Sequence, residues 1–153
     1  LSTGDGVGGI ASVIGGVLEN CTLARNASRY CAGIYCGAKG LVRNCVVGSG
    51  RMLTSDKPAT NAGWAGTASG FSRCTFDVEP PNADCKTDES PFVSSATGDF
   101  TLAVGCGAID FASEQDWMAG ATDLAGNPRV DGDGPDAGCF QLPRPLGLLM
   151  FLR

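Results

Sequence analysis

The stretch GIASVIGGVLENCTL, residues 9–23, is followed 24 residues later by GIYCGAKGLVRNCVV, residues 33–47. The two stretches align without a gap, and they share two glycines, an isoleucine and an Asn-Cys pair. The matching positions are Gly9/Gly33, Ile10/Ile34, Gly16/Gly40, Asn20/Asn44 and Cys21/Cys45. A third, looser copy occupies residues 63–76. A fixed period of this size is typical of an architecture in which successive repeats stack on one another.

Each copy contains short apolar runs that are interrupted by glycine, such as Val13-Ile14 and Leu41-Val42. Helices usually need about 10 to 12 residues, and an internal glycine costs a helix about 1 kcal/mol. Short strands separated by turns fit the pattern better. The repeat therefore predicts coils of a parallel β-helix, stacked about 4.8 Å apart. An antiparallel sandwich with coincidental repetition is the alternative.

Stacked coils would place equivalent residues in columns. We expect Asn20 to lie over Asn44, with their amides hydrogen-bonded from coil to coil at a turn. Cys21, Cys45 and Cys74 would form a neighbouring column.

The composition excludes several classes of function. The chain has 153 residues, 23 glycines, 43% hydrophobic residues, a net charge of −5 and no histidine. An acidic chain without basic clusters is a poor match for nucleic acid or an anionic membrane. The absence of histidine removes the usual general base. No apolar run approaches the roughly 18 residues of a membrane span.

Eight cysteines in a small glycine-rich chain favour an oxidising compartment and some disulfides. For Cys21, Cys45 and Cys74 two interpretations stay open, because free cysteine also packs as a small apolar core residue. The better disulfide candidates are Cys31, Cys36, Cys85, Cys106 and Cys139. Their connectivity does not follow from the sequence.

Residues 48–62 form a polar insertion that lengthens the third coil. Insertions in stacked repeats loop out on one face, which is often the binding face. Asp56 in this loop and Trp64 just after it are therefore ligand-binding candidates. A tolerated surface loop and a core position for Trp64, in register with Ile10 and Ile34, are the alternatives.

Three carboxylates in a glycine-rich turn, Asp131, Asp133 and Asp136, are the ligand type that calcium prefers. We expect calcium if the protein holds any cofactor. Zinc is not expected, because the chain has neither a C-x-x-C pair nor a histidine. The sequence also lacks a phosphate loop, a nucleophile elbow and a cluster of carboxylates on the coils. No catalytic constellation is therefore predicted.

Five phrases follow one another in the second half: SPFV (90–93), GDFTL (98–102), GAID (107–110), GNPR (126–129) and DAGCF (136–140). This succession resembles the C-terminal end of bacterial secreted right-handed parallel β-helix proteins with pectate-lyase-like repeats, whose closing region is of the choice-of-anchor type. The resemblance covers nearly the whole chain. It implies an exported or cell-surface bacterial protein with an all-β fold: about three right-handed coils and a C-terminal β cap.

The expected organisation is coils in 1–78, a closing region in 79–142 and an apolar tail in 143–153. Cys106 and Cys139 depart from the residues that the resembled family has at these positions, which suggests a Cys106–Cys139 disulfide. Asp110 and Arg129 match family positions, and the resemblance makes them a buried ion pair that braces the closing region.

The sequence favours a non-enzymatic extracellular module with a structural or adhesive role. Its partners would be further copies of itself, joined through open coil ends or the apolar tail, or a surface polysaccharide. Two alternatives remain: the C-terminal portion of a secreted polysaccharide lyase or glycosidase, and a carbohydrate-binding module.

Overall fold

The computed structural model describes residue 9 and residues 15–53 and 63–144. This part of the chain is all-β, as predicted, and its helical residues are confined to two short 3-10 turns, η1 (Ala68–Gly70) and η2 (Asp116–Met118). The strands are two to four residues long. Glycines and left-handed turn residues end them, because the chain must change direction every few residues.

The first strands pair in parallel with strands one repeat later. Each residue faces the residue 24 positions along the chain, so Val17 pairs with Leu41, Thr22 with Val46 and Ala27 with Arg51. The 24-residue period of the sequence therefore equals the spacing along the chain between paired residues. The pairs are β1 (Val17–Glu19) with β5 (Leu41–Arg43), β2 (Thr22–Ala24) with β6 (Val46–Gly48), and β3 (Ala27–Ser28) with β7 (Arg51–Met52).

We call each turn of the chain around the stack of strands a pass. The third pass continues the parallel pairing. Ile34 pairs with Trp64 and Val46 with Thr75. The last parallel strand pairs Thr75 with Lys86, so the stack extends beyond residue 78, where it was expected to end. The strands added are β4 (Ile34–Cys36), β8 (Trp64–Gly66), β9 (Phe71–Ser72), β10 (Thr75–Phe76) and β11 (Lys86–Thr87).

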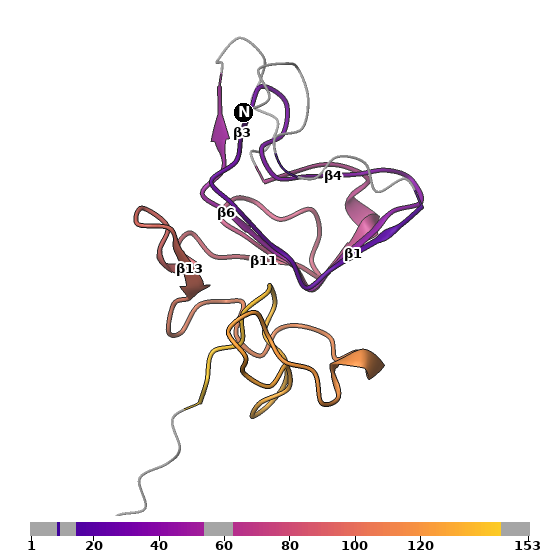
Figure 1. Cartoon of the computed structure of the whole chain (residues 1–153). Helices are drawn as coiled ribbons and strands as arrows, with labels where there is room; N and C mark the ends of the chain where they lie inside the picture. The colour runs from indigo at the N-terminus through magenta and orange to yellow at the C-terminus, as the bar shows by residue number, and fades with distance from the viewer. Residues whose placement is uncertain (1–8, 10–14, 54–62, 145–153) are drawn as a thin grey trace, which may run out of the picture.

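Successive passes overlie one another in Figure 1, where strands β4, β1 and β6 mark three sides around a common interior. The interior is filled by a continuous apolar cluster. Its buried members are Leu23, Ile34, Cys36, Val42, Cys45, Val47, Phe71, Cys74, Phe76 and Cys85.

A column of glycines explains why the repeat conserves its first position from copy to copy. A Cβ atom on Gly33 would lie 1.9 Å from the carbonyl oxygen of Gly63. A Cβ atom on Gly9 would lie 2.3 Å from the carbonyl oxygen of Gly33. Only glycine lets the backbones of successive passes approach this closely.

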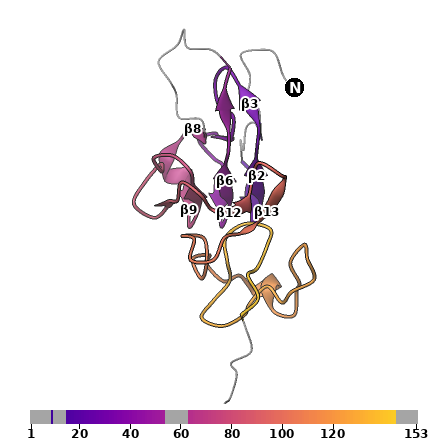
Figure 2. The ribbon, with the colours of Figure 1, turned by 90° about the vertical axis from the view of Figure 1, so that its left-hand side faces the viewer.

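The segment after β11 differs from the β cap that was expected. It consists of turns, two isolated bridges and one antiparallel hairpin, β12 (Phe92–Ser94) with β13 (Asp99–Leu102). Figures 1 and 2 show it beside the stack, below the corner where the sides marked by β1 and β6 meet.

The second segment, residues 88–144, is attached to the flank of the stack by both packing and hydrogen bonds. Val47 points into the interior, whereas Val46 packs in a second cluster that includes Phe92 and Leu102. The amide of Gly138 donates to the carbonyl oxygen of Asn44 at 2.8 Å. Strand β6 is thus buried on both faces. Its outer face is covered by the second segment, which therefore packs on the side of the stack.

Candidate functional site

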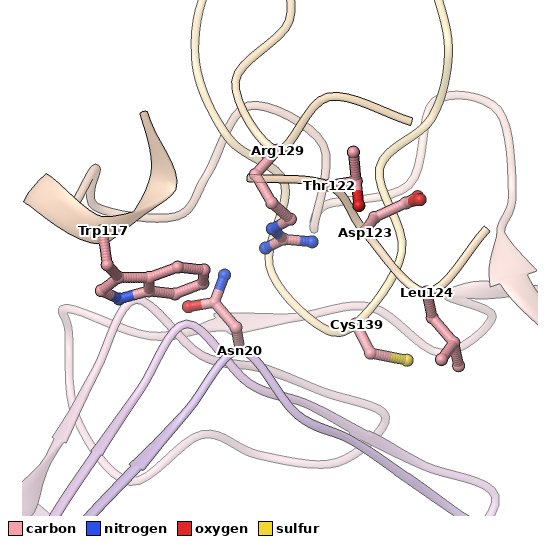
Figure 3. Close-up of a pocket in the computed structure, with 7 residues that line it drawn as sticks. All are labelled: Asn20, Trp117, Thr122, Asp123, Leu124, Arg129 and Cys139. Carbon is pink, nitrogen blue, oxygen red and sulfur yellow. The ribbon is translucent and has the colours of Figure 1, made fainter. Parts of the chain in front are cut away.

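A hollow of about 290 Å³ lies where the second segment meets this corner of the stack (Figure 3). We call it the corner pocket. It is lined by Asn20, Trp117, Thr122, Asp123, Leu124, Arg129 and Cys139. Asn20 comes from the stack, and the other lining residues come from the second segment.

Asn20 is presented by a left-handed turn that recurs at the same position in the next two passes. The φ angles are +51° at Asn20, +56° at Asn44 and +50° at Arg73. Asparagine adopts this conformation more readily than most residues. The main chain holds the turns together, because the Asn20 amide donates to the Arg43 carbonyl oxygen at 3.2 Å.

Hydrogen bonds fix which way the Asn20 side chain points. The amide of Ser113 donates to Oδ1 of Asn44 at 2.8 Å, so Nδ2 of Asn44 is left as a donor. That nitrogen donates to Oδ1 of Asn20 at 3.1 Å and to the Ser113 carbonyl oxygen at 2.8 Å. The Nδ2 group of Asn20 is buried and has no hydrogen-bond partner among the described residues. Figure 3 shows it facing Arg129.

Arg129 is the most unusual residue of the pocket. It is only 2% exposed, and its Nη2 donates to the carbonyl oxygen of Asp136 at 3.0 Å. Its Nε and Nη1 atoms are buried without a hydrogen-bond partner in the described part of the chain. Burying a cationic donor without an acceptor is costly. Three unpartnered donor nitrogens, two from Arg129 and one from Asn20, therefore belong to side chains that line the corner pocket (Figure 3).

Two acidic residues offset the charge of Arg129 without satisfying these donors. Burial lowers the pKa of Arg129, and the carboxylates of Asp123 and Asp136 counter that effect. Guanidinium nevertheless stays protonated in proteins. The pocket therefore keeps a cationic donor.

Asp123 is occupied by structural hydrogen bonds. Its Oδ1 accepts from the amides of Ala125 at 2.8 Å and Asn127 at 2.7 Å. Its Oδ2 accepts from the amide of Gln141 at 2.7 Å and from Nδ2 of Asn127 at 3.1 Å. Burial raises the pKa of Asp123, but these hydrogen bonds outweigh burial and hold the pKa below its usual value. Asp123 is therefore a charged anchor for the turn that carries Arg129.

Trp117 supplies a flat apolar wall beside the three donors. It lies on η2, whose next residue, Met118, is 1% exposed and anchors the turn. Trp117 itself is 49% exposed and borders the pocket next to Asn20 and Arg129 (Figure 3). An exposed aromatic ring next to hydrogen-bond donors suits a ligand with one apolar face and one polar edge.

Trp64, one of the two ligand-binding residues expected from the sequence, does not line this pocket. Trp64 pairs with Ile34 and packs on the interior core, edge to face with Phe71 at 5.8 Å. Its Nε1 donates to the carbonyl oxygen of Glu79 at 2.9 Å. Trp64 thus follows the alternative interpretation, a core position. Asp56 lies outside the described residues.

The three expected calcium ligands are not brought together. Both carboxylate oxygens of Asp136 accept backbone amides, from Asp110 and Leu142 at 2.7 Å each. Asp133 instead faces Arg144, at 3.3 Å. Asp131 likewise accepts from the Arg144 amide, at 3.3 Å. In the described ranges no group of three or more His, Cys, Asp or Glu side chains is placed to hold a metal ion.

The expected ion pair between Asp110 and Arg129 is replaced by another. Asp110 pairs with Arg144 at 2.5 Å, while Arg129 bonds a backbone carbonyl. The exchange leaves Arg129 free to face the pocket.

All eight cysteines carry free thiols in the structure, so neither the Cys106–Cys139 disulfide nor any other is formed. Cys106 is buried in the second cluster, and Cys139 borders the corner pocket. Cys31 and Cys36 are fully buried. Cys21, Cys45 and Cys74 are brought into one column, and Cys85 extends it.

No protein-family model, curated protein or solved structure matches this chain. The described part contains no helix long and apolar enough to cross a membrane.

Sequence reasoning missed the corner pocket because its parts are far apart in the chain. Asn20 was singled out for its role in the repeat, and Arg129 for an ion pair. No motif around Trp117 marked it as a binding residue.

Proposed function

We propose that this chain is a non-enzymatic module of an extracellular bacterial protein that binds a carboxylate-bearing sugar of a surface polysaccharide. The observation that carries the proposal is the pair of unpartnered guanidinium nitrogens of Arg129, buried and facing the corner pocket. The proposed scaffold is a short right-handed parallel β-helix, which the in-register parallel pairing at 24 residues supports.

The ligand group is inferred from what the donors lack. Arg129 and Asn20 offer three nitrogens and need acceptors. A carboxylate is an acceptor only, with two oxygens, and its hydrogen bonds to guanidinium are stronger than neutral ones. Asp123 and Asp136 offset the charge of Arg129 but leave its Nε and Nη1 atoms without an acceptor among the described residues, and the oxygens of the ligand would supply one.

The rest of the ligand is inferred from the wall and the volume. The ring of Trp117 is half-exposed and can cover the C–H face of a pyranose. A hollow of about 290 Å³ is at the lower limit of small-molecule sites, which suits one sugar unit of a longer chain. The ligand that fits both features is a hexuronate residue.

Binding without turnover is favoured because the pocket offers no free acid or base. Glycosidase chemistry uses two carboxyl groups with separate roles. The pocket is lined by a single carboxylate, Asp123, and both of its oxygens accept structural hydrogen bonds. Its lowered pKa also suits a permanent anion better than a proton donor.

Tryptophan fluorescence tests the proposal. The chain has two tryptophans, so a Trp64→Phe background leaves Trp117 as the reporter. We expect galacturonate or glucuronate oligomers to change Trp117 emission in a saturable manner, and neutral glucose oligomers to have no effect.

Two charge variants decide whether Arg129 is responsible. Arg129→Gln should weaken binding by about 10- to 100-fold, the size of one charge-assisted hydrogen bond. Arg51→Gln removes the same charge at an exposed site on β7 and should leave affinity unchanged. Equal affinity for neutral and acidic oligomers, or no loss in Arg129→Gln, would refute the proposal.

A further inference from the structure

Four cysteines occupy the same position in four successive passes of the chain. The register pairs their next neighbours, Thr22 with Val46, Val46 with Thr75 and Thr75 with Lys86. The cysteines that precede these residues therefore lie one above another. From one end to the other, the column runs Cys21, Cys45, Cys74, Cys85.

The strand register places the thiols of the column side by side. The Sγ atoms of Cys21, Cys45 and Cys74 each donate to the backbone carbonyl oxygen two residues earlier, at 3.2 Å. The backbone amide of Cys45 also donates to Sγ of Cys74, at 3.4 Å. The remaining cysteines, Cys31, Cys36, Cys106 and Cys139, lie outside this register.

Adjacent members are within reach of a disulfide. Paired strands lie about 4.8 Å apart, and disulfides join Cα atoms separated by about 4.4–6.8 Å. Their Cβ atoms must approach to about 3.8 Å, so adjacent passes must draw slightly together. A bond formed under such strain is easily reduced again.

The ends of the column are the points of entry. Cys45 and Cys74 are 0% exposed, whereas Cys85 is 7% exposed and Cys21 is half-buried. A small disulfide therefore meets an end of the column before its middle. Each end cysteine has one thiol neighbour, which settles its partner.

We propose that this column is a modification site for small-molecule disulfides, in which Cys21 becomes bonded to Cys45 and Cys74 to Cys85. This pairing is the arrangement that uses all four thiols, because a bond between Cys45 and Cys74 would leave both end cysteines without an adjacent thiol. The inference does not depend on the corner pocket.

The chemistry is two successive thiol–disulfide exchanges at each pair. An end cysteine first loses its proton, and its thiolate attacks the small disulfide R–S–S–R, forming protein–S–S–R and releasing one R–S⁻, which takes up that proton. The neighbouring cysteine then loses its proton and attacks the protein sulfur, forming the protein disulfide and releasing a second R–SH. Two protein thiols are oxidised for each small disulfide reduced.

Peptide mapping of the whole chain tests this pairing. The reduced native protein is incubated with 2-hydroxyethyl disulfide, its remaining thiols are alkylated in denaturant, and it is digested. Trypsin separates Cys21 from Cys45, whereas Cys74 and Cys85 share a tryptic peptide that cleavage before Asp77 and Asp84 divides. We expect both predicted bonds, with the four cysteines outside the column alkylated. A Cys45–Cys74 or Cys106–Cys139 bond, or four unreacted column thiols, would overturn the proposal.

Two variants sharpen the result. Cys85→Ser removes an end of the column, and the Cys21–Cys45 bond should form at an unchanged rate while Cys74 stays a thiol. A shift to a Cys45–Cys74 bond would show that exposure does not direct the pairing, contrary to the proposal. Cys106→Ser lies outside the column and should leave the map unchanged; altered column bonds in this variant would also count against it.

Discussion

Asn44 and Ser113 are joined by two hydrogen bonds of 2.8 Å, although 69 residues separate them in the chain. The Asn44 side chain accepts from the Ser113 amide and donates to the Ser113 carbonyl oxygen. This fully buried amide therefore connects the repeat to the segment packed on its flank.

Substitutions of Asn44 should separate the contribution of its side-chain hydrogen bonds to stability from that of its left-handed backbone conformation. Asn44→Gly removes the side-chain hydrogen bonds and should cost about 2 kcal/mol of unfolding free energy. Asn44→Ala should cost about 1 kcal/mol more, because alanine is strained at the φ of +56° found there. Urea denaturation measures both. Equal stability of the two variants would show that the left-handed conformation is not the reason for asparagine.

Gly33 should tolerate no side chain. A Cβ atom there would lie 1.9 Å from the Gly63 carbonyl oxygen, so Gly33→Ala must push two passes apart. We expect a loss of about 3 kcal/mol, in the range of severe overpacking. Gly134→Ala is the control, because a Cβ atom at Gly134 has no heavy atom within 4 Å. Thermal denaturation that ranks the two variants alike would contradict the close approach.

Asp123 should make stability fall at acid pH. Its folded pKa is lowered, so its contribution is present above the unfolded value of about 3.9 and is lost as pH falls through the folded value. Asp123→Asn should therefore cost about 2 kcal/mol near neutral pH, and the gap to wild type should shrink below about pH 4.

Denaturant titrations across this pH range check the expectation for Asp123. Asp133→Asn, at a side chain that is 85% exposed, should show almost no gap at any pH. A gap for Asp123→Asn that stays constant into acid would mean that its charge does not matter.

Asn20→Asp should mimic the proposed ligand. The new carboxylate would face the unpartnered nitrogens of Arg129, as the Asn20 amide does now (Figure 3). We expect stability to rise by about 1 kcal/mol and hexuronate binding to disappear. In an Arg129→Gln background the same change should give no gain. Stabilisation that persists without Arg129 would argue against their pairing.

The repeat part of the fold could be predicted because it is local and periodic. Asn20 and Asn44 share a turn, and Gly9 and Gly33 share a close approach, so the sequence repeats whatever the backbone repeats. The extension of the stack to Lys86 could not be predicted, since it follows a short turn outside the 24-residue period.

The corner pocket could be predicted only in fragments. Arg129 was expected to pair with Asp110, but Arg144 takes that carboxylate instead. Whether Arg129 or Arg144 reaches Asp110 depends on how the turns of the second segment pack together. These turns do not repeat in the sequence, so no local pattern predicts their packing.

The sequence by itself determined the all-β class, the parallel register and the columns of asparagine and cysteine, because strand spacing forces equivalent residues of equal-length repeats to coincide. Only the tertiary structure decided that the second segment lies along the flank of the stack. The reason is that Val46 and Asn44 turn outward and require apolar and hydrogen-bonding partners, which the second segment supplies. That docking carries Arg129 and Trp117 to Asn20 and so creates the corner pocket.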